Sequence, residues 1–258
     1  MPMTSPRTWT EIQEIAGLVA RAEKVVVLTG AGISTESGIP DFRGPNGVWT
    51  RDPAAEKLSS LDHYMSDPDL RVRVWQTRLR HPARRARPNR AHEALARLEA
   101  VGRLDTLITQ NIDGLHLAAG TSPDRLIEIH GNMREVVCMG CGGRGPMERA
   151  LNRVRSGDAD PSCEDCGGIL KSATISFGQS LVREDLARAQ RAARSCDLFL
   201  AVGTSLTVYP VAYLPRLALE AGAGLVIFNA EPTPLDAHAD ARVEGRVGES
   251  LPALVGVL

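Results

Sequence analysis

Residues 25–44 read VVVLTGAGISTESGIPDFRG, an apolar run followed by a glycine turn. Four aliphatic residues without alternation predict a strand buried on both faces, and open α/β sheets bind ligands at the turns that end such strands. Gly30 and Gly32 lack a Cβ, so the backbone can turn tightly and bring its N–H groups close to a pyrophosphate. The sequence therefore predicts a nucleotide site directly after this strand.

The side chains of this stretch favour the same site but leave an alternative open. Ser34 and Thr35 offer hydroxyl donors, and Arg43 offers a planar fork for a phosphate or carboxylate. The third glycine of a G-x-G-x-x-G dinucleotide motif would fall at Thr35, so a tight turn without a ligand is the competing interpretation. Residues 40–44, PDFRG, place an acid, an aromatic ring and a cation where a helix would ordinarily run, which favours an ordered loop over a ligand.

Composition fits an ordinary soluble protein. The 258 residues are 43% hydrophobic and 24% charged, enough for one large domain or one domain with an insertion. The formal net charge of -1 argues against a global attraction to nucleic acid or to an anionic membrane. No signal-peptide pattern and no run of about 18 apolar residues is present, so we expect a cytoplasmic protein without a membrane partner.

Strand-like and helix-like segments alternate along most of the chain, which predicts an α/β fold with a parallel sheet. Each expected strand ends in small or polar residues, so several loops should converge on one crevice. The expected strands are 25–28, 104–109, 126–129, 173–177, 198–202 and 225–228, and the expected helices are 10–22, 89–101, 182–193 and 211–221.

Residues 45–88 interrupt this alternation and read as a helical insertion punctuated by X-Pro pairs. Its end is basic, because residues 71–90 hold eight arginines. This segment is either a polyanion-binding face or a solvated helix surface, and the second interpretation is favoured because Trp75 is the one aromatic residue among the arginines.

Residues 133–172 contain two C-x2-C pairs separated by 21 residues, Cys138 with Cys141 and Cys163 with Cys166. This spacing is typical of a zinc ribbon, although a redox dithiol or free thiols are alternatives. Four protein thiolates leave no open coordination position, so the zinc ion should be structural. Cys196 reads as a small core residue.

Polar residues follow the expected strands at three further places. Gln110, Asn111 and Asp113 could hydrogen-bond an amide and ribose hydroxyls, although Asn111 or Asp113 could instead cap a helix. His130 ends a strand and has a pKa suited to proton abstraction near neutral pH, and its proximity to the 109–116 loop favours this role over a structural one. His116 is the weaker candidate because it should begin a helix.

Taken in order, these motifs resemble the sirtuin family. The resemblance covers the chain from about residue 20 to the C-terminus. Its motifs are GAGIS at 30–34, PDFRG at 40–44, TQNIDGLH at 109–116, HGN at 130–132, the paired C-x2-C motifs, FG at 177–178 and GTSL at 203–206. GPNGVWT at 44–50 is similar to the branch that holds nuclear mono-ADP-ribosylating and deacylating sirtuins, whereas the 51–88 insertion looks bacterial.

The resemblance implies a Rossmann-like, doubly wound NAD-binding domain of residues 1–44, 89–132 and 173–258. The helical insertion (45–88) and the zinc ribbon (133–172) would together form a small domain. It also implies an NAD-dependent protein-lysine deacylase, most simply a deacetylase, that transfers the acyl group of an acyl-lysine peptide to ADP-ribose and releases nicotinamide.

The resemblance assigns roles to individual residues. His130 is the expected general base, with Asn111 as a second catalytic residue, and Phe42 should cover the reacting ribose. The peptide should add as a strand between Phe177-Gly178 and the segment from Leu206 to Val208. The expected NAD contacts are Gly30, Ala31, Gly32, Ser34, Thr35, Asp41, Phe42, Arg43, Gln110, Asn111, Ile112, Asp113, Gly203, Thr204, Ser205, Asn229, Ala230, Glu231 and Val247.

Two departures from the family pattern bear on the substrate. Gln179 follows FG where many relatives carry Glu, which removes a charge that could favour a basic peptide. Trp75-Gln-Thr-Arg78 stands where deacylases that prefer acidic acyl groups carry Tyr-x-x-Arg, so desuccinylation is not favoured. Alternative functions are mono-ADP-ribosyl transfer to protein, a nucleic-acid-binding zinc ribbon and, last, a hydride-transferring dehydrogenase.

Overall fold

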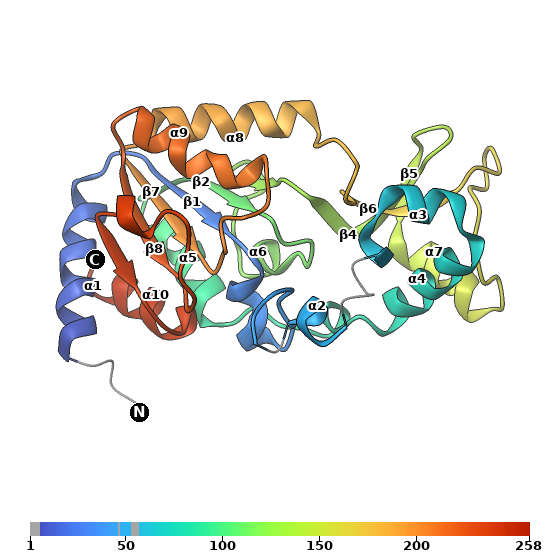
Figure 1. The fold of residues 1–258 in the computed structure, drawn as a ribbon, viewed down its shortest axis with the longest axis horizontal. Helices are drawn as coiled ribbons and strands as arrows, with labels where there is room; N and C mark the ends of the chain where they lie inside the picture. Colours follow the sequence, from blue (N-terminus) through green and yellow to red (C-terminus); the bar gives the residue numbers. More distant parts are fainter. Residues whose placement is uncertain (1–5, 46, 53–56) are drawn as a thin grey trace.

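The computed structural model describes residues 6–45, 47–52 and 57–258, with side chains from residue 9. Its main layer is a six-stranded parallel sheet of order β3-β2-β1-β7-β8-β9 (Figure 1). The order reverses between β1 and β7, and a ligand crevice forms at the carboxyl ends of strands that flank such a point. The strands are β1 (Val25–Thr29), β2 (Leu104–Thr109), β3 (Leu126–Glu128), β7 (Leu198–Val202), β8 (Gly224–Phe228) and β9 (Ala241–Val243).

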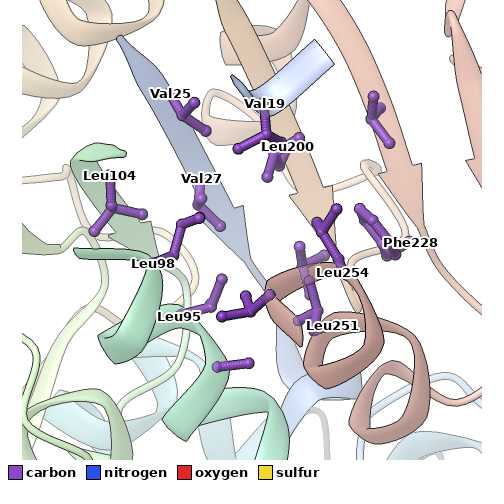
Figure 2. Packing of buried hydrophobic residues seen from close by; sticks show 14 of the residues in the cluster. Val19, Val25, Val27, Leu95, Leu98, Leu104, Leu200, Phe228, Leu251 and Leu254 are labelled. Atoms are coloured by element: carbon purple, nitrogen blue, oxygen red, sulfur yellow. The ribbon is translucent and has the colours of Figure 1, made fainter. Parts of the chain in front are cut away.

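Helices cover both faces of this sheet. One face carries α1 (Pro6–Arg21), α5 (Arg90–Ala100) and α10 (Val247–Gly256), and the other carries α8 (Arg183–Ser195) and α9 (Leu214–Glu220). Val25 and Val27 of β1 point into the first core, shown in Figure 2 beside Leu95 and Leu254. The alternate residues of β1 lie in the second core. The prediction of a first strand buried on both faces is confirmed.

A second, antiparallel sheet of order β5-β4-β6 belongs to a small domain. It consists of β4 (Gly131–Cys138), β5 (Arg144–Pro146) and β6 (Leu170–Thr174), covered by α7 (Met147–Arg155). The helical insertion supplies α2 (Val48–Arg51), α3 (Leu61–Ser66), α4 (Pro68–Arg80) and a 3-10 turn, η3 (Pro82–Arg84). Trp75 of α4 shares one core with Cys138 and Leu151, so the insertion and the cysteine segment pack as one unit. None of the described helices is long and apolar enough to cross a membrane.

The expected strand at 173–177 is wrong. The strand lies earlier, at Leu170–Thr174, and pairs antiparallel with β4 in the small sheet. This strand buries three polar residues, Lys171, Ser172 and Thr174. Because it is not an apolar run, the hydrophobic pattern of the sequence does not indicate it. Residues 176–179 instead form a turn, in which the Gln179 side chain accepts the Ser176 N–H at 3.2 Å.

Smaller differences concern element ends and short elements. The first helix begins at Pro6, and the expected helix at 211–221 divides into η4 (Val211–Tyr213) and α9. The eight-residue strand β4, the short strands β5 and β9 and the 3-10 helix η1 (Ala31–Ser37) were not expected. Residues 1–5, 46 and 53–56, which the expected domains and the GPNGVWT motif include, lie outside the described residues.

Candidate functional site

The glycine turn after β1 contacts the turn after β7, backbone against backbone. The Gly30 N–H donates to Val202 O at 3.0 Å and the Gly32 N–H donates to Gly203 O at 2.9 Å. A Cβ on Gly32 would lie 2.8 Å from Gly203 Cα, and Gly203 itself has a φ of 58°. These contacts require glycine. They also occupy the N–H groups of Gly30 and Gly32, so a pyrophosphate at this turn would have to use other N–H groups, and its binding here stays a prediction.

A buried polar network lies beneath this turn. Asn111 Nδ2 donates to Gly30 O at 3.0 Å and to Ser34 Oγ at 3.1 Å. Ser34 Oγ donates to Asp113 Oδ2 at 2.7 Å, while Asp113 Oδ1 accepts the Leu115 N–H at 2.9 Å and so begins α6 (Leu115–Ala118). Asp113 therefore supports the start of α6, whose N-cap residue is Gly114, and also ties the 109–116 loop to the glycine turn.

Two buried histidines extend this network into the core. The Ser34 hydroxyl lies 3.4 Å from His92 Nε2, and the Thr29 hydroxyl lies 3.0 Å from His116 Nε2. Burial lowers the pKa of His92 to about 4, against the opposing charge of Asp113. Burial, helped by the charge of His92, also lowers the pKa of His116 well below its usual value. Both rings are neutral near neutral pH, and His116 does begin a helix as expected.

Gln110 joins three strand ends. Its N–H donates to Thr29 O at 3.0 Å, and its Nε2 donates to Thr204 Oγ1 at 2.9 Å. Its carbonyl oxygen lies 3.1 Å from His130 Nδ1. The expected convergence of the turns after β1, β2 and β7 with His130 is therefore present.

His130 is held as a neutral base. Burial lowers its pKa, and the hydrogen bond to the Gln110 carbonyl opposes this shift. Because a carbonyl can only accept, Nδ1 carries the proton and Nε2 is left with a free lone pair. The His130 carbonyl accepts the Ile175 N–H at 2.8 Å, which fixes the backbone between the two sheets.

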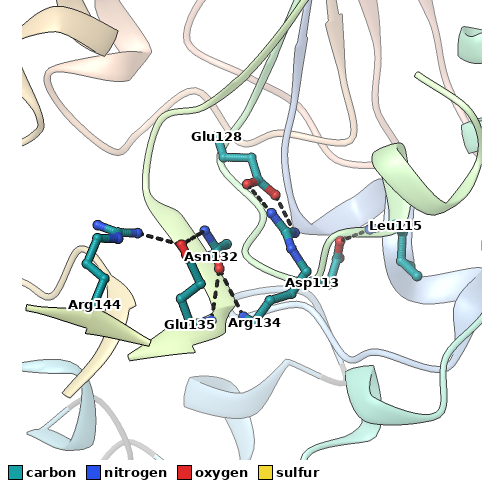
Figure 3. A network of polar contacts seen from close by, with 7 residues as sticks. All are labelled: Asp113, Leu115, Glu128, Asn132, Arg134, Glu135 and Arg144. Carbon is teal, nitrogen blue, oxygen red and sulfur yellow. Dashed lines mark hydrogen bonds and ion pairs between the residues drawn. The ribbon is translucent and has the colours of Figure 1, made fainter. Parts of the chain in front are cut away.

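The segment after His130 is braced where β4 leaves the large domain (Figure 3). Gly131 has a φ of 70°, and a Cβ there would lie 2.1 Å from Ala173 O. Arg134 makes a two-point ion pair with Glu128 of β3, with N–O distances of 2.8 and 2.6 Å. Asn132 Oδ1 accepts the Arg134 N–H at 3.0 Å. These contacts set the direction in which β4 starts, and with it the position of His130.

Residues 40–45 form turns and bends, as expected of a loop. The Trp49 ring packs against this loop. The Trp49 ring lies 4.8 Å from the Phe42 ring and 5.5 Å from the Phe177 ring, between centroids. The Arg43 guanidinium lies 4.6 Å from the Trp49 centroid. Asp41 Oδ1 accepts the Gly44 N–H at 3.0 Å. Trp49 is not among the expected site residues, although it belongs to the GPNGVWT motif at 44–50.

The residues expected to hold the adenosine half of NAD differ in how exposed they are. Ser205 Oγ lies 2.8 Å from Thr207 Oγ1 and is partly exposed at the crevice side of β7. Asn229 Nδ2 donates to the Glu231 carbonyl at 2.8 Å, and Ala230 and Glu231 are exposed. Val247 is buried in the core on the face of the sheet that carries α1, α5 and α10.

The expected peptide-binding residues lie on two loops. The Phe177 N–H donates to Ser59 O at 2.8 Å, and Phe177 O accepts the Leu61 N–H at 2.9 Å. The Phe177 backbone is thus already paired, and a peptide strand there would have to use Gly178 and the residues beyond it. Leu206 has a φ of 53° and a buried side chain, and Val208 is partly exposed.

The four paired cysteines converge in the small domain. Their sulfur atoms all lie within 4.8 Å of one another, with 3.5 Å between Cys138 and Cys166 and 3.8 Å between Cys141 and Cys163. Tetrahedral Zn–S bonds of about 2.3 Å require sulfur separations of about 3.8 Å. The Gly140 N–H donates to the Cys138 sulfur, as expected around a thiolate. The donor set fits zinc, and Cys196 is buried elsewhere in the core, as expected.

Comparison with known proteins agrees with this geometry. A family model described as the Sir2 family matches residues 30–210. The chain belongs to the Sir2 family.

The Sir2 relatives span nearly the whole chain. NAD-dependent protein deacetylase 2 of Streptomyces coelicolor is 52% identical over 231 residues, which are 90% of this chain and 96% of the relative. An NAD-dependent protein deacetylase of Rhodopseudomonas palustris is 41% identical over 257 residues, 98% of this chain and 100% of the relative. A solved Sir2 structure with a deacetylated p53 peptide and 3'-O-acetyl ADP-ribose has a TM-score of 0.88 at 35% identity and covers 95% of this chain and 97% of its own.

Removing one zinc ligand should destabilise this Sir2 chain. We expect Cys141→Ser to lose the bound zinc and to lower the thermal midpoint by about 10 °C, because metal binding contributes directly to local folding. Cys196→Ala, which removes the one cysteine outside the cluster, should keep one zinc per chain. Metal analysis and calorimetry check this, and full zinc content in Cys141→Ser would contradict the assignment.

The buried neutral histidines should make folding acid-sensitive. Burial lowers the pKa of His81 to about 4, as it does for His92, so between pH 6.5 and 4 the unfolded chain binds more protons than the folded chain. Stability should be retained above pH 6.5 and fall with acid by about 1.4 kcal/mol per pH unit for each such histidine. His81→Asn should reduce this slope by one histidine in urea titrations at several pH values; a slope equal to that of the parent protein would refute the account.

Proposed function

We propose that this Sir2 chain is an NAD-dependent protein-lysine deacylase, acting first of all as a deacetylase. The observation that carries the proposal is the hydrogen bond from His130 Nδ1 to the Gln110 carbonyl, which leaves Nε2 free as a base beside the converging turns. The curated relatives are named NAD-dependent protein deacetylases, which supports the same activity.

NAD, when bound, supplies both the ribose carbon that receives the acyl oxygen and the hydroxyl that later attacks the acyl carbon. His130 takes the proton from that ribose hydroxyl, directly or through its neighbour, at Nε2. Asn111 holds the glycine turn in place through Gly30 O and Ser34 and orients the nicotinamide side of the site. Phe42, which is exposed, covers the reacting face and limits attack by water.

The remaining expected NAD contacts, including Asp41, Arg43, Ile112 and Ser205, are part of this proposal. The turn after β1 would hold the nicotinamide half, and the ends of β7 and β8 would hold the adenosine half. The four cysteines would hold one structural zinc ion that takes no part in bond making, since thiolates fill its coordination shell.

The proposed substrate is an acetyl-lysine segment of a protein. Trp75, which stands in place of the tyrosine typical of acidic-acyl deacylases, is buried in the core of the small domain and offers no hydroxyl to a substrate. Arg78 donates to Ser172 Oγ at 3.1 Å. Use of cysteine as a metal ligand supports a reducing compartment such as the cytoplasm.

The function is tested by following both products. Zinc-loaded protein with acetyl-lysine peptide and NAD should release nicotinamide and O-acetyl-ADP-ribose in equal amounts, read by mass spectrometry. With NAD labelled in its adenylate part and no acyl peptide, label that becomes bound to protein would indicate mono-ADP-ribosyl transfer instead. A lack of acetyl-ADP-ribose would reject the proposal.

His130→Ala should lower kcat/KM by about 10²- to 10⁴-fold, because it removes the general base. The control His238→Ala changes an exposed histidine and should stay near the parent rate. Since burial lowers the pKa of His130, the kcat/KM of the parent protein should fall with decreasing pH only below pH 6.5. Normal turnover by His130→Ala would show that His130 is not the general base.

Trp49→Ala should raise the KM for the peptide about tenfold, because two ring contacts of about 0.5–1.5 kcal/mol each link the Phe42 loop to Phe177. Trp49→Phe should restore most of the loss, since an aromatic ring remains between the two loops. Trp9→Ala, at an exposed tryptophan of α1, is the matched control. Unchanged KM with a lower kcat in Trp49→Ala would show that the ring does not position the peptide loop.

A further inference from the structure

The structure divides the eight arginines of residues 71–90 into two groups. Three of them serve the small domain. Arg71 pairs with Asp160 at 2.8 Å, Arg84 pairs with Glu148, and Arg78 bonds Ser172. The other five, at 73, 80, 85, 87 and 90, are exposed, and none of them has an ion pair within the described chain. Contacts within the small domain therefore account for three of the eight arginines and leave the other five without a structural role.

Arg85, Arg87 and Arg90 gather around one hollow of about 590 Å³. We call this hollow the arginine groove; it is lined by Glu36, Ser37, residues 85–90 and Glu93. None of its lining residues is an expected NAD contact or an expected peptide contact. The three arginines come from one six-residue stretch, 85–90, and all three line the same hollow.

Charge and composition of the groove select the kind of ligand. Guanidinium forks bind phosphate oxygens in two-point contacts, and Ser37 adds a hydroxyl. Among the described residues no aromatic side chain lines the groove, so they offer no surface for stacking a base. The Glu36 carboxylate is held by α10, where it accepts the Gly248 N–H at 3.0 Å, while Glu93 is exposed on α5. The free charges nearest the hollow are thus mainly positive.

We propose that the arginine groove binds a compact oligoanion made of two or three linked phosphates. Three unpaired arginines around one hollow match several phosphate charges held close together, whereas a nucleic-acid strand needs a longer basic track. The whole-chain charge of -1 is consistent with a local site and not with a broad nucleic-acid surface.

The groove also shares a wall with the glycine turn. Asn89, at the base of the groove, donates from Nδ2 to Ile33 O at 2.7 Å and to Ser37 Oγ at 3.0 Å. The same side chain caps α5, which carries His92 into the buried network. An anion in the groove would therefore sit on the outer side of the residues that hold η1.

Inorganic tripolyphosphate tests the proposal by calorimetry in a phosphate-free buffer of low ionic strength. Saturating ADP-ribose is present throughout, so that the cofactor crevice is already filled. We expect one tripolyphosphate per chain, bound about tenfold more weakly by the double variant Arg85→Ala/Arg87→Ala. Arg73→Ala, an exposed arginine of α4 outside the groove, should bind like the parent protein. The double variant should keep its deacetylase rate, which shows that it is folded.

Three results would overturn the proposal. One is no binding of tripolyphosphate by the ADP-ribose-loaded protein. Another is equal binding by the parent and the double variant, which would place the anion elsewhere. The last is tighter binding of a single-stranded oligonucleotide than of tripolyphosphate, with loss in the double variant, which would assign the groove to a nucleic-acid backbone.

Discussion

The contact between two glycine turns is the constraint on which the rest of this structure depends. Gly30 and Gly32 lie against Gly203 so closely that a side chain on any of the three would displace the other turn. This contact fixes the ends of β1 and β7 at the point where the sheet order reverses. The crevice of the doubly wound sheet is thus shaped by backbone, and the N–H groups of Gly30 and Gly32 hold the two turns together.

Residues of the 109–116 loop then connect the two glycine turns to His130. Asn111 and Asp113 hold the first turn, and Gln110 reaches the turn after β7 while its carbonyl fixes the proton on His130. The small domain enters at the same place, because β4 begins one residue after His130 and is braced by Glu128 and Arg134. The same hydrogen bonds therefore position His130, shape the crevice at the strand ends and fix the start of β4.

The sequence predicts those parts whose physical cause is local. Four consecutive aliphatic residues make β1 recognisable, and the spacing of the four cysteines leads directly to their observed cluster. It fails where the cause lies in another segment. β6 is buried although it contains Lys171, and Tyr64 of α3 and Arg78 of α4 hydrogen-bond to it. The importance of Trp49 arises from two rings, Phe42 and Phe177, that are far apart in the chain. The use of the glycine N–H groups also depends on a partner turn more than 170 residues away.

The central claim is that the turns after β1, β2 and β7 form one cofactor site with His130. Hydrogen–deuterium exchange with and without ADP-ribose tests it most directly. The account predicts that peptides covering residues 30–44, 109–116 and 203–208 gain protection together at one ligand concentration, while α7 in the small domain does not. Protection of only one of these segments, or protection confined to a distant surface, would contradict it.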